Sequence, residues 1–268
     1  MIKKIVFISM LGAAIMSCSK VPISNRKQMN LIPESQLTAL SLTEYRDFLS
    51  KAKVVPSSDA NAQLVKSVGQ KISSATTRFM TQNKMAERVK GYNWEFNLVD
   101  DKNINAFCMP GGKVVVFTGL LPVTKDESSL AFVMGHEVAH AVARHGNERV
   151  SQGLVAQMGG IALDVAMSQK NAQTRVLVQQ AYGMGVTVGG ILPFSRLHES
   201  EADKLGMVFM AMAGYDPSKS SELWARMSAA SGGGKPPEFL STHPSDAKRM
   251  AEMKKFLPQA MKYYTAKK

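Results

Sequence analysis

The stretch His136-Glu137-Val138-Ala139-His140 places two histidines four residues apart, with a glutamate directly after the first. Upstream, Thr124-Lys125-Asp126-Glu127 has the pattern of a capping box, so we expect a helix from Thr124 to Gly146. Four residues are about one helical turn, so both imidazoles project from one face and can bind one metal ion. Neutral imidazole is a good zinc ligand. The alternative, two surface histidines beside a glutamate, is disfavoured because this pattern seldom arises by chance.

A catalytic zinc ion usually takes three protein ligands and keeps one position for water. Downstream, Glu199 and Asp203 are four residues apart on one predicted helix face. Glu199 offers a carboxylate to the metal, and Asp203 can orient a ligating histidine through its other ring nitrogen. Glu201 is rotated about 200° from Glu199 and fits that pairing less well. The sequence therefore predicts one Zn²⁺ per chain, with ligands His136, His140 and Glu199.

Two further histidines are interpreted as structural. His145 is five residues after His140, about 140° round the helix, and is expected to be a polar group near the helix C-terminus. His198 points about 100° away from Glu199. Neither is expected to contact the metal.

The remaining pattern is typical of a mostly helical α+β domain. Residues 92–99 alternate apolar and polar side chains, as a half-buried strand does, and 104–109 and 113–118 are two more expected strands around Pro110-Gly111-Gly112. Helices are expected at about 34–50, 60–88, 151–170, 174–190, 196–213, 218–230 and 245–257. A small β-sheet thus precedes the helix that carries the two histidines.

The N-terminus has the layout of a secretory signal: Lys3 and Lys4, an apolar run from Ile5 to Met16, then Ser17-Cys18. The run is shorter than the about 20 residues that a membrane span needs. Ile15-Met16-Ser17-Cys18 resembles a bacterial lipobox, which implies cleavage before Cys18 and lipid attachment to its sulfur. A plain signal peptide that contains a cysteine is the alternative. We expect residues 1–17 to be a signal peptide, 18–32 a lipid-anchored tether and 33–268 a single domain.

The formal net charge is +12 and the chain has two cysteines, which excludes a disulfide-rich scaffold. No nucleic-acid motif accompanies the basic charge, so a solvated basic surface is favoured over a nucleic-acid partner. Residues 176–195 carry no charge but include several glycines and glutamines. A helix over the core, or a flap, is favoured there over a membrane span.

Four ordered motifs resemble the zinc metallopeptidase family of the CAAX prenyl protease, HtpX and the mitochondrial Oma-type enzymes. They are Asn105–Gly112, the histidine-glutamate motif at 136–140, Ser195–Asp203, and Ser241-Thr242-His243-Pro244 with Arg249. The chain is similar in particular to small bacterial lipoprotein members such as LoiP and to the protease domain of BepA. The resemblance implies a zincin-type fold and zinc-dependent endopeptidase activity on misfolded or misassembled cell-envelope proteins. It also implies a lipid-anchored protein of the outer membrane that faces the periplasm.

The implied mechanism assigns Glu137 as the base that takes a proton from the attacking water. His243, on a loop before a proline, and Arg249 are the candidate donors to the oxyanion, with His243 preferred. Asn105, Ala106 and Phe107 are expected to pair with an extended substrate at a strand edge, and Arg249 to face it. The alternatives are an interior hairpin of the core and a surface or structural role for Arg249. Two other functions stay open. One is a chaperone-like lipoprotein with a latched zinc site, and the other is a non-peptidase hydrolase.

Overall fold

The structure is a computed structural model that describes residues 18–186, 192–229, 238–244 and 247–264. The expected signal peptide, residues 1–17, lies outside them. The chain forms two compact units. One consists of residues up to Pro33 together with Arg144–His198, and the other of Glu34–Ala143 together with Glu199–Lys268. We refer to them as unit 1 and unit 2.

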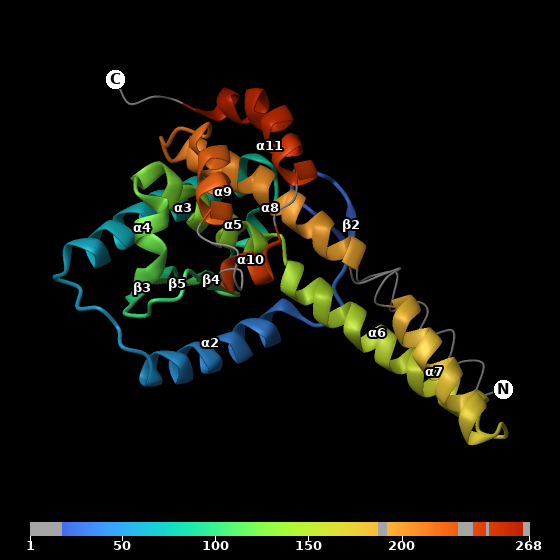
Figure 1. The fold of residues 1–268 in the computed structure, drawn as a ribbon. Coiled ribbons are helices and arrows are strands. Elements are labelled where there is room, and N and C mark those ends of the chain that lie inside the picture. Colours follow the sequence, from blue (N-terminus) through green and yellow to red (C-terminus); the bar gives the residue numbers. More distant parts are fainter. Residues whose placement is uncertain (1–17, 187–191, 230–237, 245–246, 265–268) are drawn as a thin grey trace. The chain divides into compact units, whose positions relative to one another are not determined.

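Unit 2 contains a three-stranded sheet with the strand order β3-β5-β4 (Figure 1). The central strand β5 (Lys113–Phe117) runs parallel to β3 (Glu95–Val99) and antiparallel to β4 (Ala106–Met109). All five residues of β5 are buried, as expected for its apolar Val-Val-Val run between two neighbours. Gly111 and Gly112 form the turn before β5 at φ values of 89° and 85°, which favour glycine. The sheet predicted ahead of the histidine-bearing helix is therefore present.

The helices of the structure cover most of the chain, which confirms the mostly helical α+β class. They are α2 (Glu34–Lys51), α3 (Ala60–Gln82), α4 (Leu121–Thr124), α5 (Glu127–Val142), α6 (His145–Ala166), α7 (Ala172–Val186), α8 (Leu192–Met212), α9 (Lys219–Ala229), α10 (Glu238–Thr242) and α11 (Ala247–Ala260). Short 3-10 turns lie at Ala86–Arg88, Thr118–Leu120 and Met261–Tyr263. Helix α5 is the centre of unit 2, where it packs against α3, α9 and β4.

The ends of α5 differ from those expected. Asp126, not Thr124, is the N-cap, and its side chain accepts a hydrogen bond of 2.8 Å from the amide of Ser129. Thr124 instead ends α4, where its hydroxyl donates to the carbonyl of Leu121. The helix ends at Val142 rather than Gly146, because Arg144 adopts a left-handed conformation with φ of 60°. His145 thus begins α6, three residues after α5 ends.

Helices α5 and α8 approach each other closely at two glycines. A Cβ atom added to Gly206 would lie 3.0 Å from the backbone nitrogen of His136, and one added to Gly135 would lie 3.1 Å from the carbonyl oxygen of Gly206. Both distances are shorter than ordinary carbon contacts, so a side chain at either position would push the helices apart. The two glycines therefore hold the histidine-bearing segment of α5 against α8.

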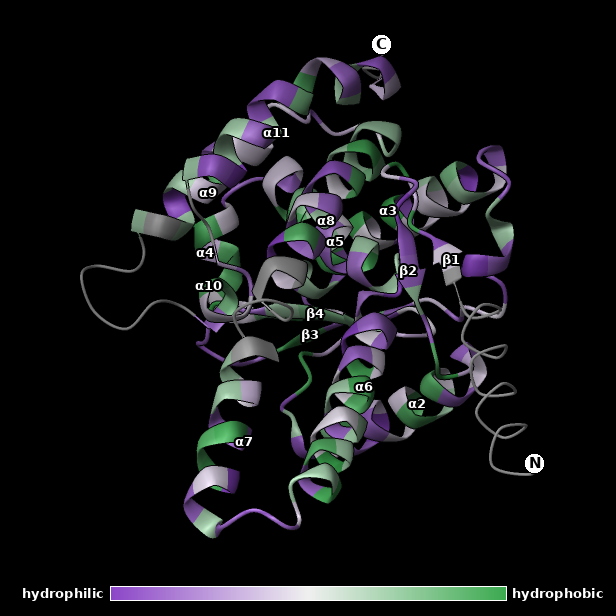
Figure 2. Ribbon diagram, turned by 90° about the vertical axis from the view of Figure 1, so that its right-hand side faces the viewer, coloured by the Kyte–Doolittle hydropathy of each residue, from purple (hydrophilic) through white to green (hydrophobic). Residues whose placement is uncertain are grey.

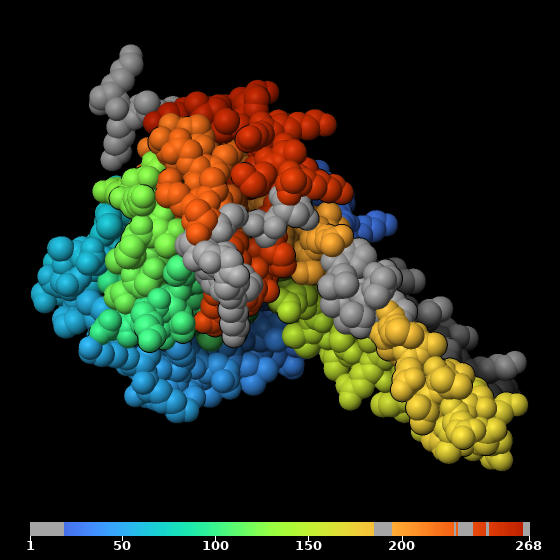
Figure 3. Space-filling model, viewed as in Figure 1, coloured from blue at the N-terminus to red at the C-terminus, as the bar shows by residue number. Residues whose placement is uncertain are grey.

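Unit 1 combines a two-stranded sheet with a helical hairpin. Strands β1 (Cys18–Lys20) and β2 (Lys27–Met29) pair antiparallel within the segment expected to be a tether. Helices α6 and α7 pack side by side, and the hydroxyl of Tyr182 donates to the carbonyl of Ala156 at 2.9 Å (Figures 1 and 3). Among the described residues, no helix has the length and apolar character that a membrane crossing requires.

Candidate metal centre

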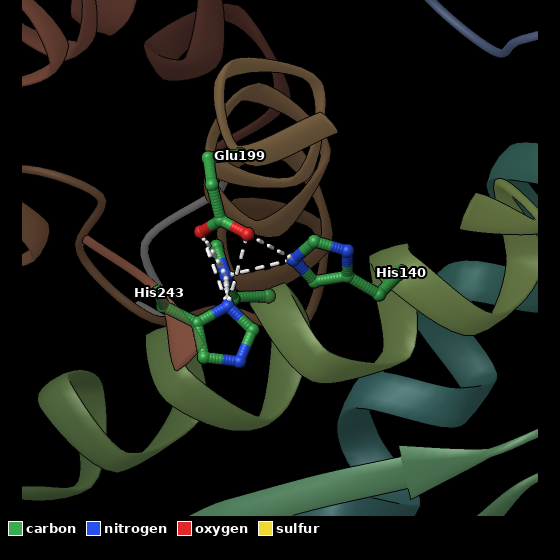
Figure 4. Close-up of side chains that lie close together, drawn as sticks. His140, Glu199 and His243 are labelled. Atoms are coloured by element: carbon green, nitrogen blue, oxygen red, sulfur yellow. Dashed lines mark hydrogen bonds and ion pairs between the residues drawn. The ribbon is translucent and has the colours of Figure 1, made fainter. Parts of the chain in front are cut away.

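Four donor side chains of unit 2 converge on one point: His136 and His140 of α5, Glu199 of α8, and His243 directly after α10. Nε2 of His136 lies 3.1 Å from Nε2 of His140 and 3.4 Å from Oε2 of Glu199. Oε1 of Glu199 lies 3.3 Å from Nε2 of His140. Figure 4 shows the labelled side chains of His140, Glu199 and His243 pointing toward one another. The three residues predicted as ligands are thus brought together.

His243 adds a fourth donor atom to this group. Its Nδ1 lies 3.3 Å from Nε2 of His136 and 3.1 Å from both carboxylate oxygens of Glu199. The backbone amide of His243 donates to the carbonyl of Phe239 at 2.8 Å, which fixes the residue at the end of α10. The short helix α10 was not expected from the sequence. This helix positions the imidazole of His243 at the donor group, whereas the sequence predicted only that His243 lies on a loop.

The spacing of these atoms fits a zinc ion. Four ligands at 2.0–2.1 Å from a shared tetrahedral centre are about 3.3–3.4 Å from each other. Five pairs of these side chains have donor-atom separations of 3.1–3.4 Å, taken with one or the other carboxylate oxygen of Glu199, and all four donor atoms lie within 4.8 Å of one another. Two or three imidazole nitrogens with one carboxylate oxygen is also a donor set that suits Zn²⁺. The residues present therefore fit the predicted metal in both chemistry and distance.

Asp203 and Arg249 contact the side chains of this donor group without being donors themselves. Oδ1 of Asp203 lies 3.1 Å from Nδ1 of His136, on the far side of the ring from the other donors. This contact directs Nε2 toward the donor group, which is the role predicted for Asp203. Arg249 holds Asp203 with two hydrogen bonds of 2.5 and 2.8 Å, and its Nη1 lies 2.9 Å from Oε2 of Glu199. Arg249 also donates to the backbone carbonyl oxygen of Pro244 at 3.0 Å.

Burial and these neighbours shift the pKa values of the site. Burial alone would lower the pKa of His136, but hydrogen bonds to Asp203 and Glu199 outweigh it and raise this pKa to about 9. Burial alone would raise the pKa of Glu199, but His140 and the other imidazoles hold it well below its usual range. The pKa of Asp203 is likewise lowered, because Arg249 outweighs the effect of burial. In the protein without metal, the site thus pairs anionic carboxylates with cations.

Glu137 is placed differently from the donors. It lies on α5 beside them, 4% exposed, with Oε1 3.4 Å from Nε2 of His243. Burial raises the pKa of Glu137, although the nearby His243 and His136 partly oppose this shift. A carboxylate beside a metal position, but outside the donor group, has the geometry of a general base.

The predicted substrate-binding residues lie at a strand edge. β4 is an outer strand of the sheet, and it pairs only with β5 among the described strands. Asn105 is buried, and its side-chain oxygen accepts from the amide of Ala106 at 2.9 Å. The Phe107 ring packs on Phe48 of α2 at 5.3 Å between ring centres. The backbone edge of β4 is therefore the part of this strand that could pair with a peptide.

Two aromatic side chains beside the site were not predicted from the sequence. The ring of Phe239 lies 4.7 Å from that of His243, and Trp224 stacks under the guanidinium of Arg249 at 4.1 Å. Both aromatic side chains are buried. They come from α10 and α9, and nothing in their spacing relates them to the histidines of α5. The two histidines set aside as structural, His145 and His198, stack on each other in unit 1 at 4.4 Å.

Comparison with known proteins agrees with this geometry. Residues 67–257 match the sequence model of peptidase family M48. The chain is 35% identical over 243 residues to the mitochondrial metalloendopeptidase OMA1 of Schizosaccharomyces pombe, covering 90% of this chain and 66% of the relative. It is 33% identical over 248 residues to the human mitochondrial metalloendopeptidase OMA1, covering 90% and 46%. The beta-barrel assembly-enhancing protease of Escherichia coli is 32% identical over 167 residues, covering 59% and 33%.

The chain thus spans between about one third and two thirds of the length of these relatives. The family match, in contrast, covers most of this chain and includes every residue of the candidate metal centre. The relatives with the printed name OMA1 are metalloendopeptidases, in agreement with the donor group of unit 2. The chain belongs to peptidase family M48.

Proposed function

We propose that the protein is a zinc-dependent endopeptidase with His136, His140 and Glu199 as the metal ligands. The observation that carries this proposal is the group of four donor atoms within 4.8 Å of one another, with the carboxylate of Glu137 next to the group and outside it. The match to a peptidase family supports the reaction class. One Zn²⁺ per chain would supply Lewis-acid polarisation of the scissile carbonyl and a lower pKa for the attacking water.

The residues around the site each have a task in peptide hydrolysis. Glu137 takes a proton from the attacking water and delivers it to the leaving amine, and its raised pKa suits both transfers. The free edge of β4 holds the substrate backbone in an extended conformation through main-chain hydrogen bonds. Asp203 keeps the ring of His136 in one orientation, and Arg249 keeps Asp203 ionised.

His243 regulates the same site. Its Nδ1 lies 3.1–3.3 Å from donor atoms of His136 and Glu199, so with zinc bound it would compete with the attacking water for the fourth coordination position. Its Nε2 lies next to Glu137. In this conformation the imidazole latches the enzyme. When it swings away to admit a substrate, the same group can donate a hydrogen bond to the oxyanion.

The cellular role follows from the lipobox and from the relatives. We propose that Cys18 carries a lipid and anchors the protein to the bacterial cell envelope, at the outer membrane and facing the periplasm. The similarity to a protein named beta-barrel assembly-enhancing protease supports substrates among misassembled envelope proteins. The N-terminal segment, with its basic start, apolar run and Ser17-Cys18, supports the anchor.

Glu137→Gln tests the proposed activity. We expect zinc content to stay at about one per chain, because Glu137 is not a ligand, and casein digestion to fall by about 10²–10⁴-fold. Metal analysis and digestion with and without a chelator measure the two effects. Glu127→Gln is the matched control, because it makes the same change in the first turn of the same helix at a half-exposed side chain.

Full casein digestion by the Glu137→Gln protein would show that Glu137 is not the base. Wild-type protein that binds zinc but does not cleave casein or unfolded envelope proteins would favour a chaperone-like role instead.

A further inference from the structure

The helical hairpin of unit 1 leaves an apolar stripe uncovered. On α6, Val150, Leu154, Met158, Ile161 and Val165 are between 40% and 68% exposed. At 100° per residue they fall within about 80° of the helix circumference, so they form one continuous stripe. On α7, Leu177 and Met184 are 66% and 65% exposed and lie seven residues apart on a shared face. Figure 2 shows the hydrophobic residues recurring along both helices.

The stripe continues a face that is covered at the start of α6. There, the buried Asn147 donates to the carbonyl of Ile32 at 2.8 Å, and the hydroxyl of the buried Ser151 accepts from the amide of Leu31 at 2.8 Å. From Leu154 onward the side chains on this face are exposed. α7 packs elsewhere on α6, through Ala156, Gly160 and Asp164. The uncovered stripe is therefore a lateral surface of the hairpin and not its internal seam.

The charge of unit 1 indicates what covers the stripe. Between Cys18 and Pro33 and between Arg144 and His198 the sequence has eight Lys or Arg residues and two Asp or Glu residues, a net charge of +6. Both acids are engaged inside the unit: Glu148 by Arg26, and Asp164 by Arg175 at 2.6 Å. Two exposed cations lie at opposite ends of the hairpin: Arg149 in the first turns of α6, and Lys170 between α6 and α7. An apolar stripe with basic ends matches an anionic lipid surface.

A second copy of the chain fits this stripe less well. Helices that pair through an apolar seam usually carry opposite charges beside it, which set their register. From Val150 to Leu163 the sequence of α6 has no charged residue. A lipid surface requires no such register, and long basic side chains at the ends of the hairpin can reach phosphate groups while the apolar side chains enter the interface.

We propose that the α6–α7 hairpin lies flat on an anionic membrane surface, with the stripe from Val150 to Val165 in the headgroup boundary. This contact does not depend on the lipid proposed at Cys18 or on proteolysis. It gives unit 1 a second attachment to the membrane and orients the unit there, which a lipid chain at Cys18 alone cannot do.

The test uses the mature chain from residue 18 onward with Cys18→Ser, so that neither the apolar signal segment nor a lipid is attached. Binding to vesicles of phosphatidylcholine with about 30% phosphatidylglycerol is measured by flotation. We expect Ile161→Gln with Val165→Gln to weaken binding by at least about tenfold, since two apolar side chains leave the interface. Leu40→Gln with Met261→Gln is the matched control in unit 2, at side chains 63% and 40% exposed, and should bind as the parent does. Pure phosphatidylcholine vesicles should bind the parent at least tenfold less.

A fluorescent label identifies the contact itself. Ile161→Cys, in a background of Cys18→Ser and Cys108→Ser, carries an environment-sensitive dye, with Leu40→Cys as control. We expect anionic vesicles to shift the emission at residue 161 to the blue and leave that at residue 40 unchanged. Three results would overturn the proposal: no shift with vesicles, a shift that follows protein concentration alone and so marks a second copy, or a shift with unfolded casein but not with lipid.

Discussion

Arg249 shows how single residues balance charge in the metal centre. Three carboxyl groups, those of Glu137, Glu199 and Asp203, are each 5% exposed or less. Isolated buried charges are costly, so each needs a partner. Arg249 contacts two of the three, and its guanidinium is itself covered by Trp224. The sequence suggested that Arg249 faces the substrate, whereas its contacts support a positioning role toward Glu199 and Asp203.

The latch proposed for His243 gives a prediction at this scale. We expect the rate at which a chelator removes zinc to rise about 10–100-fold in His243→Ala, because a fourth donor is removed. Casein digestion should fall by up to about 10²–10³-fold, the usual loss of one oxyanion donor. Stopped-flow metal release and a digestion assay measure the two effects. Thr242→Ala, at the exposed neighbour, is the control. Unchanged metal release and unchanged digestion together would mean that His243 only packs locally.

At the scale of elements, the close contact of α5 with α8 sets the distance between the donor side chains. His136 and His140 lie on α5 and Glu199 lies on α8, so the separation of these helices determines whether three donors can share one ion. Gly135 and Gly206 allow the backbones to touch. The glycines therefore influence the spacing of the donor side chains without being donors themselves.

Gly206→Ala tests this arrangement. The added methyl would meet the backbone of His136 at 3.0 Å, so α8 has to move outward. We expect a loss of about 1–3 kcal/mol in the free energy of unfolding and a weaker affinity for zinc. Gly153→Ala, on exposed α6 where an added Cβ meets nothing within 4 Å, is the matched control and should gain about 0.5–1 kcal/mol. Equal zinc affinity in the two variants would refute the spacing role.

The first turn of α6 depends on a buried carboxylate. Glu148 accepts two hydrogen bonds from Arg26, at 2.6 and 2.8 Å, and lies 2.8 Å from Nε2 of His198. Burial alone would raise the pKa of Glu148, but these partners outweigh it and lower the pKa to about 2. A lowered carboxyl pKa stabilises the fold above the ordinary value near 4.5, and this stabilisation is lost as the pH falls toward 2.

We therefore expect Glu148→Gln to cost about 2–3 kcal/mol of unfolding free energy at pH 7. The difference from wild type should shrink steadily below pH 4.5. Denaturant melts from pH 7 to pH 3 measure it. Asp164→Asn on the same helix removes a half-exposed pair with Arg175 and should cost less than about 1 kcal/mol. A cost for Glu148→Gln that does not change with pH would mean that the effect comes from packing and not from charge.

The sequence predicted the elements whose pattern is local. The four-residue spacing in His136–His140 and in Glu199–Asp203 is a property of single helices, and the structure brings the predicted donors together. The predicted start of α5 was wrong. Thr124 and Asp126 are both acceptable N-cap residues, and only the preceding turn decides which of them caps the helix. The contacts of Phe239 and Trp224 were not predicted, because they join helices far apart in the sequence.

At the scale of the whole molecule, the candidate metal centre and the apolar hairpin belong to different units. All donors of the metal centre, together with Glu137, Asp203 and Arg249, belong to unit 2. Unit 1 holds the basic hairpin and the residues that follow Cys18. Since the chain between Ala143 and Glu199 is an insertion into unit 2, a change in unit 1 need not alter the metal ligands.

Zinc should therefore stabilise the two units unequally. A ligand that binds only the folded state adds about 2.7 kcal/mol at 100 times its dissociation constant, which slows exchange through unfolding about 100-fold. We expect hydrogen exchange to slow by this factor in α5, α9 and α3 when zinc is added to chelator-treated protein. Exchange in α6 and α7 should change far less, because neither helix carries a donor. His140→Ala, which lacks one ligand, is the control and should show only a small response to zinc. Equal slowing throughout α7 would mean that the units unfold as one cooperative body, and that the metal in unit 2 also governs the stability of the hairpin.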